Sequence, residues 1–106
     1  MSEYPVRRPL KRPPSHPGAL MREILEEQLR LPVAETAKRI GISRQSLYAV
    51  LRGNSKVTAE MALRFCRLAG GAPELFLAMQ DAYDLWHARA RLGAALGRIA
   101  PAGAAA

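Results

Sequence analysis

The stretch TAKRIGISRQSLYAVLRG, from Thr36 to Gly53, decides the fold of this chain, because a helix stop and a helix start meet at its centre. Gly41 lacks a Cβ atom and can therefore adopt the left-handed backbone conformation that closes a helix. The hydroxyl of Ser43 can accept a backbone N–H group and so cap the helix that follows. A turn this short forces the two helices to cross at a steep angle, which is the geometry of a helix-turn-helix.

The second helix of this motif carries polar side chains that suit DNA. In a helix-turn-helix, the start of this helix enters the major groove, where arginine can bridge O6 and N7 of guanine and glutamine can bridge N6 and N7 of adenine. We therefore expect Arg44, Gln45 and Ser46 to read bases. The candidate phosphate contacts, which position the protein without reading sequence, are Lys38, Arg39, Ser43, Tyr48, Arg52, Lys56 and Thr58. The alternative is that these polar residues are simply solvated.

Size and charge are consistent with one small nucleic-acid-binding domain. The 106 residues carry a net charge of +7, and 49% of them are hydrophobic, which argues against a wholly disordered chain. The positive charge favours a polyanionic partner. No apolar run approaches the roughly 18 residues of a membrane span, and the N-terminus does not have the pattern of a secretory signal. We therefore expect a cytoplasmic protein that is associated with the nucleoid when it binds DNA.

Proline and glycine divide the chain into an arm, a helical domain and a tail. Residues 1–15 are rich in proline and basic side chains, and we expect them to form a disordered arm. Residues 16–92 form the domain, with helices expected over 17–30, 33–40, 44–52, 59–69 and 73–92. Residues 93–106 are expected to form a flexible tail rich in alanine and glycine. The predicted fold is an all-α bundle of five helices.

The helix expected over 73–92 carries apolar residues on two faces. The face expected to point into the core is formed by Leu75, Phe76, Met79, Ala82, Tyr83 and Trp86. A second stripe is formed by Leu77, Ala78, Leu85 and Ala88. A terminal helix of a small bundle can bury only one face in its own core, so the second stripe predicts a homodimer interface. The alternative is that a single subunit buries this helix on all sides.

Patterns of catalytic or metal-binding residues are missing from the sequence. His16 and His87 are far apart and do not have the spacing of metal ligands, and we interpret His16 as part of a helix entry. The acidic residues at 26–27, 81 and 84 have the spacing of solvated helix faces. Cys66 is the single cysteine and lies in an apolar helical pattern, so we expect a buried, unreactive thiol. We predict neither an enzyme nor a cofactor or metal site.

The run RPPSHPGALMREILEE, the helix-turn-helix, and TAEMALRFCRLAGGAPELFLAMQDAYDLWHAR together closely resemble the HigA family of antitoxins. This family belongs to the wider class of Xre-type, lambda-repressor-like helix-turn-helix proteins. The motifs that carry the resemblance are HPG at 16–18, GISRQSLYAVLRG at 41–53, MALR at 61–64 and YDLW at 83–86, and of these HPG and YDLW are much more specific than a helix-turn-helix alone. The resemblance implies a homodimer that represses its own operon and neutralises a HigB-type toxin, an mRNA-cleaving ribonuclease. It also implies that residues 43–46 and Tyr48 face the operator and that the last long helix holds the dimer.

Three positions depart from the family pattern. Pro32 stands where a serine usually caps the second helix, Val33 where a phosphate-contacting glutamine is common, and Ala72 where Ser or Thr usually caps the last helix. The first two departures predict a weakened phosphate anchor. Two other functions therefore stay open, namely a stand-alone Xre-type repressor without a toxin and a toxin-binding protein with little affinity for DNA. The basic arm could follow the toxin surface, insert an arginine into a minor groove of DNA, or have no role.

Overall fold

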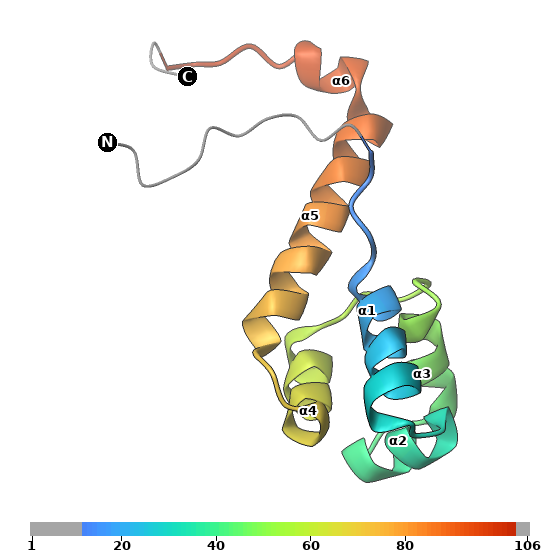
Figure 1. Cartoon of the computed structure of the whole chain (residues 1–106). Helices are drawn as coiled ribbons and strands as arrows, with labels where there is room; N and C mark the ends of the chain where they lie inside the picture. Colours follow the sequence, from blue (N-terminus) through green and yellow to red (C-terminus); the bar gives the residue numbers. More distant parts are fainter. Residues whose placement is uncertain (1–11, 104–106) are drawn as a thin grey trace.

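The computed structural model describes residues 12–103, and every regular element within them is helical (Figure 1). The elements are α1 (Pro17–Glu23), the π-helical segment η1 (Ile24–Leu29), α2 (Val33–Ile40), α3 (Arg44–Leu51), α4 (Ala59–Ala69), α5 (Pro73–Leu92) and α6 (Ala94–Gly97). The predicted all-α fold with a helix-turn-helix is confirmed. The structure adds a division of the first helix and a short helix in the expected tail. Most of the basic arm lies outside the described residues.

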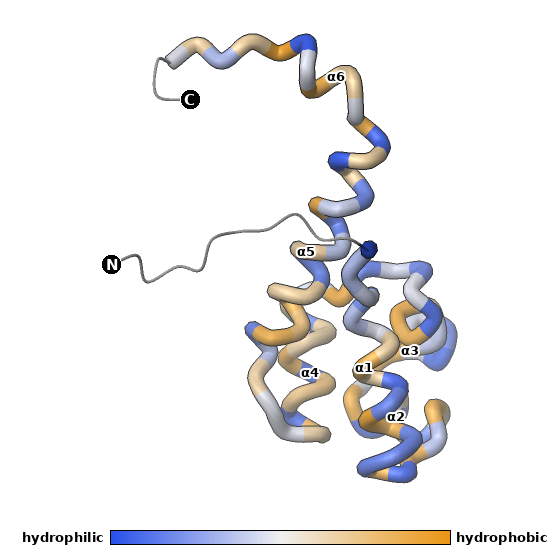
Figure 2. Tube along the Cα trace, turned by 45° about the horizontal axis from the view of Figure 1, so that its top comes forward, coloured by the Kyte–Doolittle hydropathy of each residue, from blue (hydrophilic) through white to orange (hydrophobic). Residues whose placement is uncertain are grey.

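The helices form a body from which α5 projects. Figure 1 shows α1, α2 and α3 gathered together, α4 beside the lower half of α5, and the upper half of α5 running on to α6. Hydrophobic and hydrophilic positions alternate along these helices, as expected for amphipathic elements around one core (Figure 2). The buried core consists of Met21, Leu25, Ala37, Ile40, Leu47, Val50, Leu51, Val57, Met61, Ala62, Phe65, Cys66 and Phe76. Both helices of the helix-turn-helix contribute to this core, α2 through Ala37 and Ile40 and α3 through Leu47, Val50 and Leu51.

The HPG motif starts α1 and packs it against α3. The ring nitrogen Nδ1 of His16 accepts the backbone N–H of Gly18 at 2.9 Å, and Pro17 follows at the first helical position, where its missing N–H costs nothing. A Cβ atom on Gly18 would lie 1.9 Å from the carbonyl oxygen of Val50 in α3. The helix entry predicted at His16 is confirmed, and glycine is required because two backbones meet here.

The first helix ends differently from the prediction. A single helix was expected over 17–30, whereas the structure changes to π-helical geometry from Ile24 and stops at Leu29. Arg30 then adopts a left-handed conformation, with φ 52°, and the N–H of Leu31 reaches the carbonyl oxygen of Leu25 at 3.1 Å. Apolar periodicity indicates that a helix is present but does not fix the width of its turns, so the sequence did not reveal this segment.

The inward face of α5 also differs from the prediction. Leu75 was expected to face the core but is 52% exposed, whereas Gln80 is only 3% exposed. Ala82, assigned to the same inward stripe, is exposed as well. Conversely, Leu77 was assigned to the outer stripe but packs against the core of its own subunit. Gln80 sets the face that α5 turns inward, and a prediction based on apolar residues alone does not take a glutamine into account.

Candidate nucleic-acid interface

The turn between α2 and α3 has the geometry expected from its sequence. Gly41 is left-handed, with φ 80° and ψ 36°, and its N–H and that of Ile42 both donate to the carbonyl oxygen of Ala37, at 2.9 and 3.0 Å. Ser43 is extended, and its Oγ accepts the N–H of Ser46 at 3.1 Å. The predicted stop at Gly41 and cap at Ser43 are therefore confirmed, and they fix the direction in which α3 leaves the turn.

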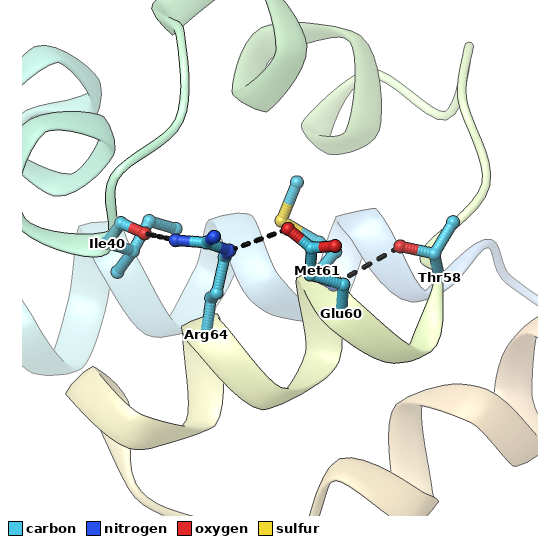
Figure 3. A network of polar contacts seen from close by, with 5 residues as sticks. All are labelled: Ile40, Thr58, Glu60, Met61 and Arg64. Carbon is cyan, nitrogen blue, oxygen red and sulfur yellow. Dashed lines mark hydrogen bonds and ion pairs between the residues drawn. The ribbon is translucent and has the colours of Figure 1, made fainter.

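Helix α4 holds this turn in place from the other side (Figure 3). Arg64 donates from Nη1 to the carbonyl oxygen of Ile40 at 2.7 Å and from Nε to Glu60 at 3.0 Å. Thr58 caps the same helix by accepting the N–H of Met61 at 3.2 Å. Sequence reasoning missed Arg64, because its partner is a backbone carbonyl 24 positions away and no local pattern signals such a contact.

Helix α3 separates an apolar face from a polar one. Leu47, Val50 and Leu51 are buried, whereas the predicted base-reading residues Arg44, Gln45 and Ser46 are exposed at its first turn. The Oγ of Ser43 donates a second hydrogen bond to Ser46 Oγ at 2.9 Å, so the Ser46 hydroxyl is partly engaged. Arg44 and Gln45 thus have the freest side chains at the tip of the helix.

The predicted phosphate contacts differ in how available they are. Lys38 is exposed at the end of α2. Arg39 pairs with Glu35 at 2.9 Å, and Lys56 pairs with Asp84 at 3.2 Å. The guanidinium of Arg52 lies 4.9 Å from the centre of the Tyr48 ring, a cation–π contact. Ser43 and Thr58 both act as helix caps.

The loop that carries Lys56 is fastened to α5 by Gln80. The Oε1 of Gln80 accepts the N–H of Val57 at 2.8 Å, and its Nε2 donates to Asp84 at 2.9 Å. Burial alone would raise the pKa of Asp84, but the hydrogen bonds from Gln80 and Lys56 and the charge of Lys56 lower it below its usual value. The expectation that Asp84 is merely solvated is therefore wrong. Gln80 was missed because its role depends on contacts made only in the folded chain.

The other candidate groups do not assemble into a reactive site. Cys66 is buried, and its burial together with the nearby carboxylate of Glu74 raises the pKa of its thiol, which opposes reactivity. Within residues 12–103, no three His, Cys, Asp or Glu side chains are grouped closely enough to hold a metal ion. None of the helices in this range has the length and apolar character needed to cross a membrane.

Two of the three departures from the family pattern have visible structural consequences. Pro32 precedes α2 and Ala72 precedes α5, and neither supplies a side-chain hydrogen bond to the helix that it starts. The carbonyl oxygen of Pro32 accepts the N–H of the buried Thr36, which is the usual first hydrogen bond of a helix, and in addition the Thr36 hydroxyl, both at 3.0 Å. The start of α2 is therefore held by backbone and threonine contacts rather than by a capping side chain.

Comparisons with known proteins agree with this geometry. Residues 21–76 match the family described as Helix-turn-helix. The uncharacterized helix-turn-helix-type transcriptional regulator YbaQ of Escherichia coli is 33% identical over 90 residues, which cover 83% of this chain and 80% of YbaQ.

Two solved structures are also similar. An addiction module antidote protein of a HigA family from Coxiella burnetii is 32% identical, with a TM-score of 0.77 over 85% of this chain and 99% of that one. PA4674 of Pseudomonas aeruginosa, solved in complex with its operator DNA, is 25% identical, with a TM-score of 0.74 over 83% of this chain and 98% of that one. These relatives are regulators and antitoxins rather than enzymes. The chain belongs to the HigA family of helix-turn-helix antitoxins and regulators.

Proposed function

We propose that this protein binds operator DNA as a homodimer, represses its own operon and neutralises a HigB-type mRNA-cleaving toxin. The observation that carries the DNA-binding part is the polar face of α3. Arg44 and Gln45 project from the first turn of a helix whose start is capped by Ser43 and whose preceding turn is held by Arg64. A helix presented in this way can enter a major groove with its base-reading side chains first.

In the proposed complex, Arg44, Gln45 and Ser46 contact bases. Lys38, Arg39, Ser43, Tyr48, Arg52, Lys56 and Thr58 form the proposed phosphate contacts. The ion pairs of Arg39 and Lys56 are solvent-exposed and therefore weak, so a phosphate can compete for either side chain. When the operator binds, Arg39 and Lys56 each exchange a weak ion pair with a carboxylate for a contact with a phosphate. The counterions that this releases from the DNA favour binding.

The proposed dimer uses the exposed face of α5. The apolar residues on this face share the helical repeat of 3.6 and are Leu75, Ala78, Met79, Ala82, Leu85 and Trp86. Leu75 and Leu85 are 52% and 51% exposed, so burial against a second copy would remove considerable apolar surface from water. From the predicted dimer set, Ala78 and Leu85 lie on this face. Leu77 already packs in its own subunit, and Ala88, three helical turns after Leu77, lies on the side of Leu77 and not on this face.

Size and charge along this face favour antiparallel pairing. The small residues Ala78 and Ala82 lie near its centre and allow two helices to approach closely. Glu74 and Arg89 lie at opposite ends, about 22 Å apart at 1.5 Å per residue, so antiparallel helices would bring unlike charges together. Such a dimer would present two α3 helices to half-sites one DNA turn, about 34 Å, apart.

Gel-shift titration on the DNA upstream of its own gene tests operator binding. We expect Arg44→Ala to cost about 1–3 kcal/mol on the preferred site and to leave binding to unrelated DNA unchanged. Arg91→Ala, which removes the same charge from the far end of α5, serves as the matched control. Equal weakening on all sequences would make Arg44 a phosphate contact, and no salt-sensitive binding by the wild type would refute the repressor function.

Light scattering at micromolar concentration tests the dimer. We expect a dimer for the wild type and a monomer for Ala82→Glu, because the substitution would bury a charge in the interface. A wild-type monomer would refute the dimer.

Co-purification with a toxin encoded beside this gene, together with inhibition of mRNA cleavage, tests the antitoxin function. Deletion of residues 1–15 shows whether the arm serves the toxin or the DNA.

A further inference from the structure

A groove opens where the end of α1, η1 and the start of α2 face the second half of α3. Its volume is about 280 Å³, and its lining consists of Arg22, Leu25, Glu26, Leu31, Val33, Tyr48, Leu51 and Arg52. The buried side chains of Leu25 and Leu51 form an apolar floor. Arg22 and Arg52 are exposed, and they place positive charge on opposite walls, one from α1 and one from the end of α3.

The two arginines are available to a ligand. Within residues 12–103, neither side chain makes an ion pair with a carboxylate, although Glu26 lines the same groove. The ring of Tyr48, 4.9 Å from the Arg52 guanidinium, restricts that side chain to one side of α3. Two guanidinium groups against one carboxylate leave a net positive groove, and guanidinium is the side-chain group best matched to the oxygens of a phosphate.

The groove lies where the DNA backbone should pass. Tyr48 and Arg52 follow Arg44 at intervals of four residues, so all three lie along one side of α3. A helix in the major groove, which is about 12 Å wide, has a phosphate backbone on either side. Val33, at the start of α2, lines the groove but offers no hydrogen bond from its side chain. Arg22 and Arg52 therefore supply the hydrogen-bond donors to phosphate that the Val33 side chain lacks.

We propose that this groove holds a phosphate group of the operator backbone, bound by Arg22 and Arg52. The inference rests on the proposed DNA-binding function and adds Arg22, a residue of α1, to the interface. Arg22 and Arg52 donate hydrogen bonds to phosphate oxygens, and Tyr48 acts as a positioning residue for Arg52. Because every nucleotide carries the same phosphate, this anchor fixes the depth and angle of α3 without reading sequence.

The test is a salt titration of DNA binding by the full-length protein. We expect Arg22→Ala to weaken binding to operator and to unrelated DNA by the same factor, and to reduce the slope of log K against log salt by about 1. When the salt concentration rises from 50 to 200 mM, the affinity of Arg22→Ala for DNA should therefore fall by a factor about threefold smaller than the affinity of the wild type. Glu26→Gln should act in the opposite direction and tighten binding to both DNAs, since among residues 12–103 Glu26 is the one carboxylate that lines the groove.

A double-mutant cycle isolates the part played by Tyr48. Tyr48→Ala and Arg52→Ala should each weaken binding, and the double variant should be less than additive, because the ring acts through the guanidinium. Tyr48→Phe keeps the ring and should restore the part of the binding that depends on Arg52, and any remaining loss measures the phosphate contact of the Tyr48 hydroxyl itself.

Arg91→Ala is again the charge-matched control. If the wild type binds the operator and Arg22→Ala has the same salt slope as the wild type, the proposed phosphate site in the groove is wrong. The proposed function would then remain intact. Unchanged DNA binding with lost toxin inhibition in Arg22→Ala would also overturn the phosphate site, and would indicate an acidic protein segment as the occupant. Failure of the wild type to bind DNA would refute the proposed function itself.

Discussion

The two sides of this molecule are held together by different kinds of contact. On one side, α1 meets α3 backbone to backbone, with Gly18 so close to the carbonyl oxygen of Val50 that a Cβ atom would lie 1.9 Å from it. On the other side, side chains join α5 to the loop before α4: Gln80 accepts the N–H of Val57, and Asp84 pairs with Lys56. Where two backbones touch, an added side-chain atom has no room. Where a side chain makes the contact, truncation of that side chain leaves the fold in place and loses only its hydrogen bonds.

The largest effect is expected from breaking the contact between α1 and α3. Gly18→Ala places a methyl group against the carbonyl oxygen of Val50, which is backbone and cannot rotate away. We expect a loss of about 3 kcal/mol or more in the free energy of unfolding, because α1 must move off α3. Chemical denaturation followed by circular dichroism measures this loss.

The matched control for this substitution is Gly97→Ala in α6. A Cβ atom at Gly97 would meet no atom within 4 Å, so the free energy of unfolding should change little. A Gly18→Ala protein as stable as the wild type would show that the two backbones are not in close contact.

A smaller loss is expected from breaking the contact of α5. Gln80→Ala leaves the N–H of Val57 buried without a partner, which costs about 1–3 kcal/mol, and leaves a space beside the loop. Gln45→Ala, which truncates an exposed glutamine of α3, should change the free energy of unfolding by less than about 0.5 kcal/mol. Equal stability of the two variants would contradict the role assigned to Gln80.

The same contrast explains what the sequence could reveal. The stop before α3 and the start of α3 depend on residues within three or four positions, and Gly41 and Ser43 were both identified correctly from the sequence. The orientation of α5 depends on a hydrogen bond between Val57 and Gln80, which are 23 positions apart, and its inward face was assigned wrongly. Helix caps and turns, which depend on neighbouring residues, can be predicted from a sequence, whereas a buried polar contact between residues far apart in the chain cannot.

The candidate interface follows the same rule. The exposed positions of α3 could be predicted, because they are what remains when Leu47, Val50 and Leu51 point inward. Arg22 could not, since it belongs to α1 and reaches the groove only through the packing of α1 on α3. No pattern in the sequence places these two helices side by side.

A gain of stability is expected where the backbone of the α1 side is strained. Arg30 is the only residue other than glycine with positive φ among those that the structure describes. Glycine accepts this conformation without a Cβ clash, so Arg30→Gly should raise the free energy of unfolding by about 1 kcal/mol. Arg30→Ala removes the charge but keeps the clash and should give no gain. A gain from alanine as well would attribute the effect to charge rather than to the backbone.

The smallest effect concerns the polar contacts of α5 and depends on pH. The lowered pKa of Asp84 means that its ionised form is favoured in the folded state. Its contribution to stability is therefore present above the unfolded pKa of about 3.9 and is lost as the pH falls through the lower, folded value. Because the Asp84 side chain is 37% exposed, solvent screens the pair with Lys56, which limits the contribution to about 0.2–1 kcal/mol.

Urea denaturation of the wild type and Asp84→Asn between pH 7 and pH 3 measures this contribution. Asparagine keeps an oxygen that can accept the Gln80 hydrogen bond, so the comparison isolates the charge. We expect the wild type to be more stable at pH 7 and the difference to shrink as the pH falls below about 4. Lys56→Ala should remove the part of the difference that comes from the ion pair and retain the smaller part by which the negative charge strengthens the hydrogen bond from Gln80. A difference that stays constant down to pH 3 would mean that Asp84 holds α5 through its shape and hydrogen bond, not through its charge.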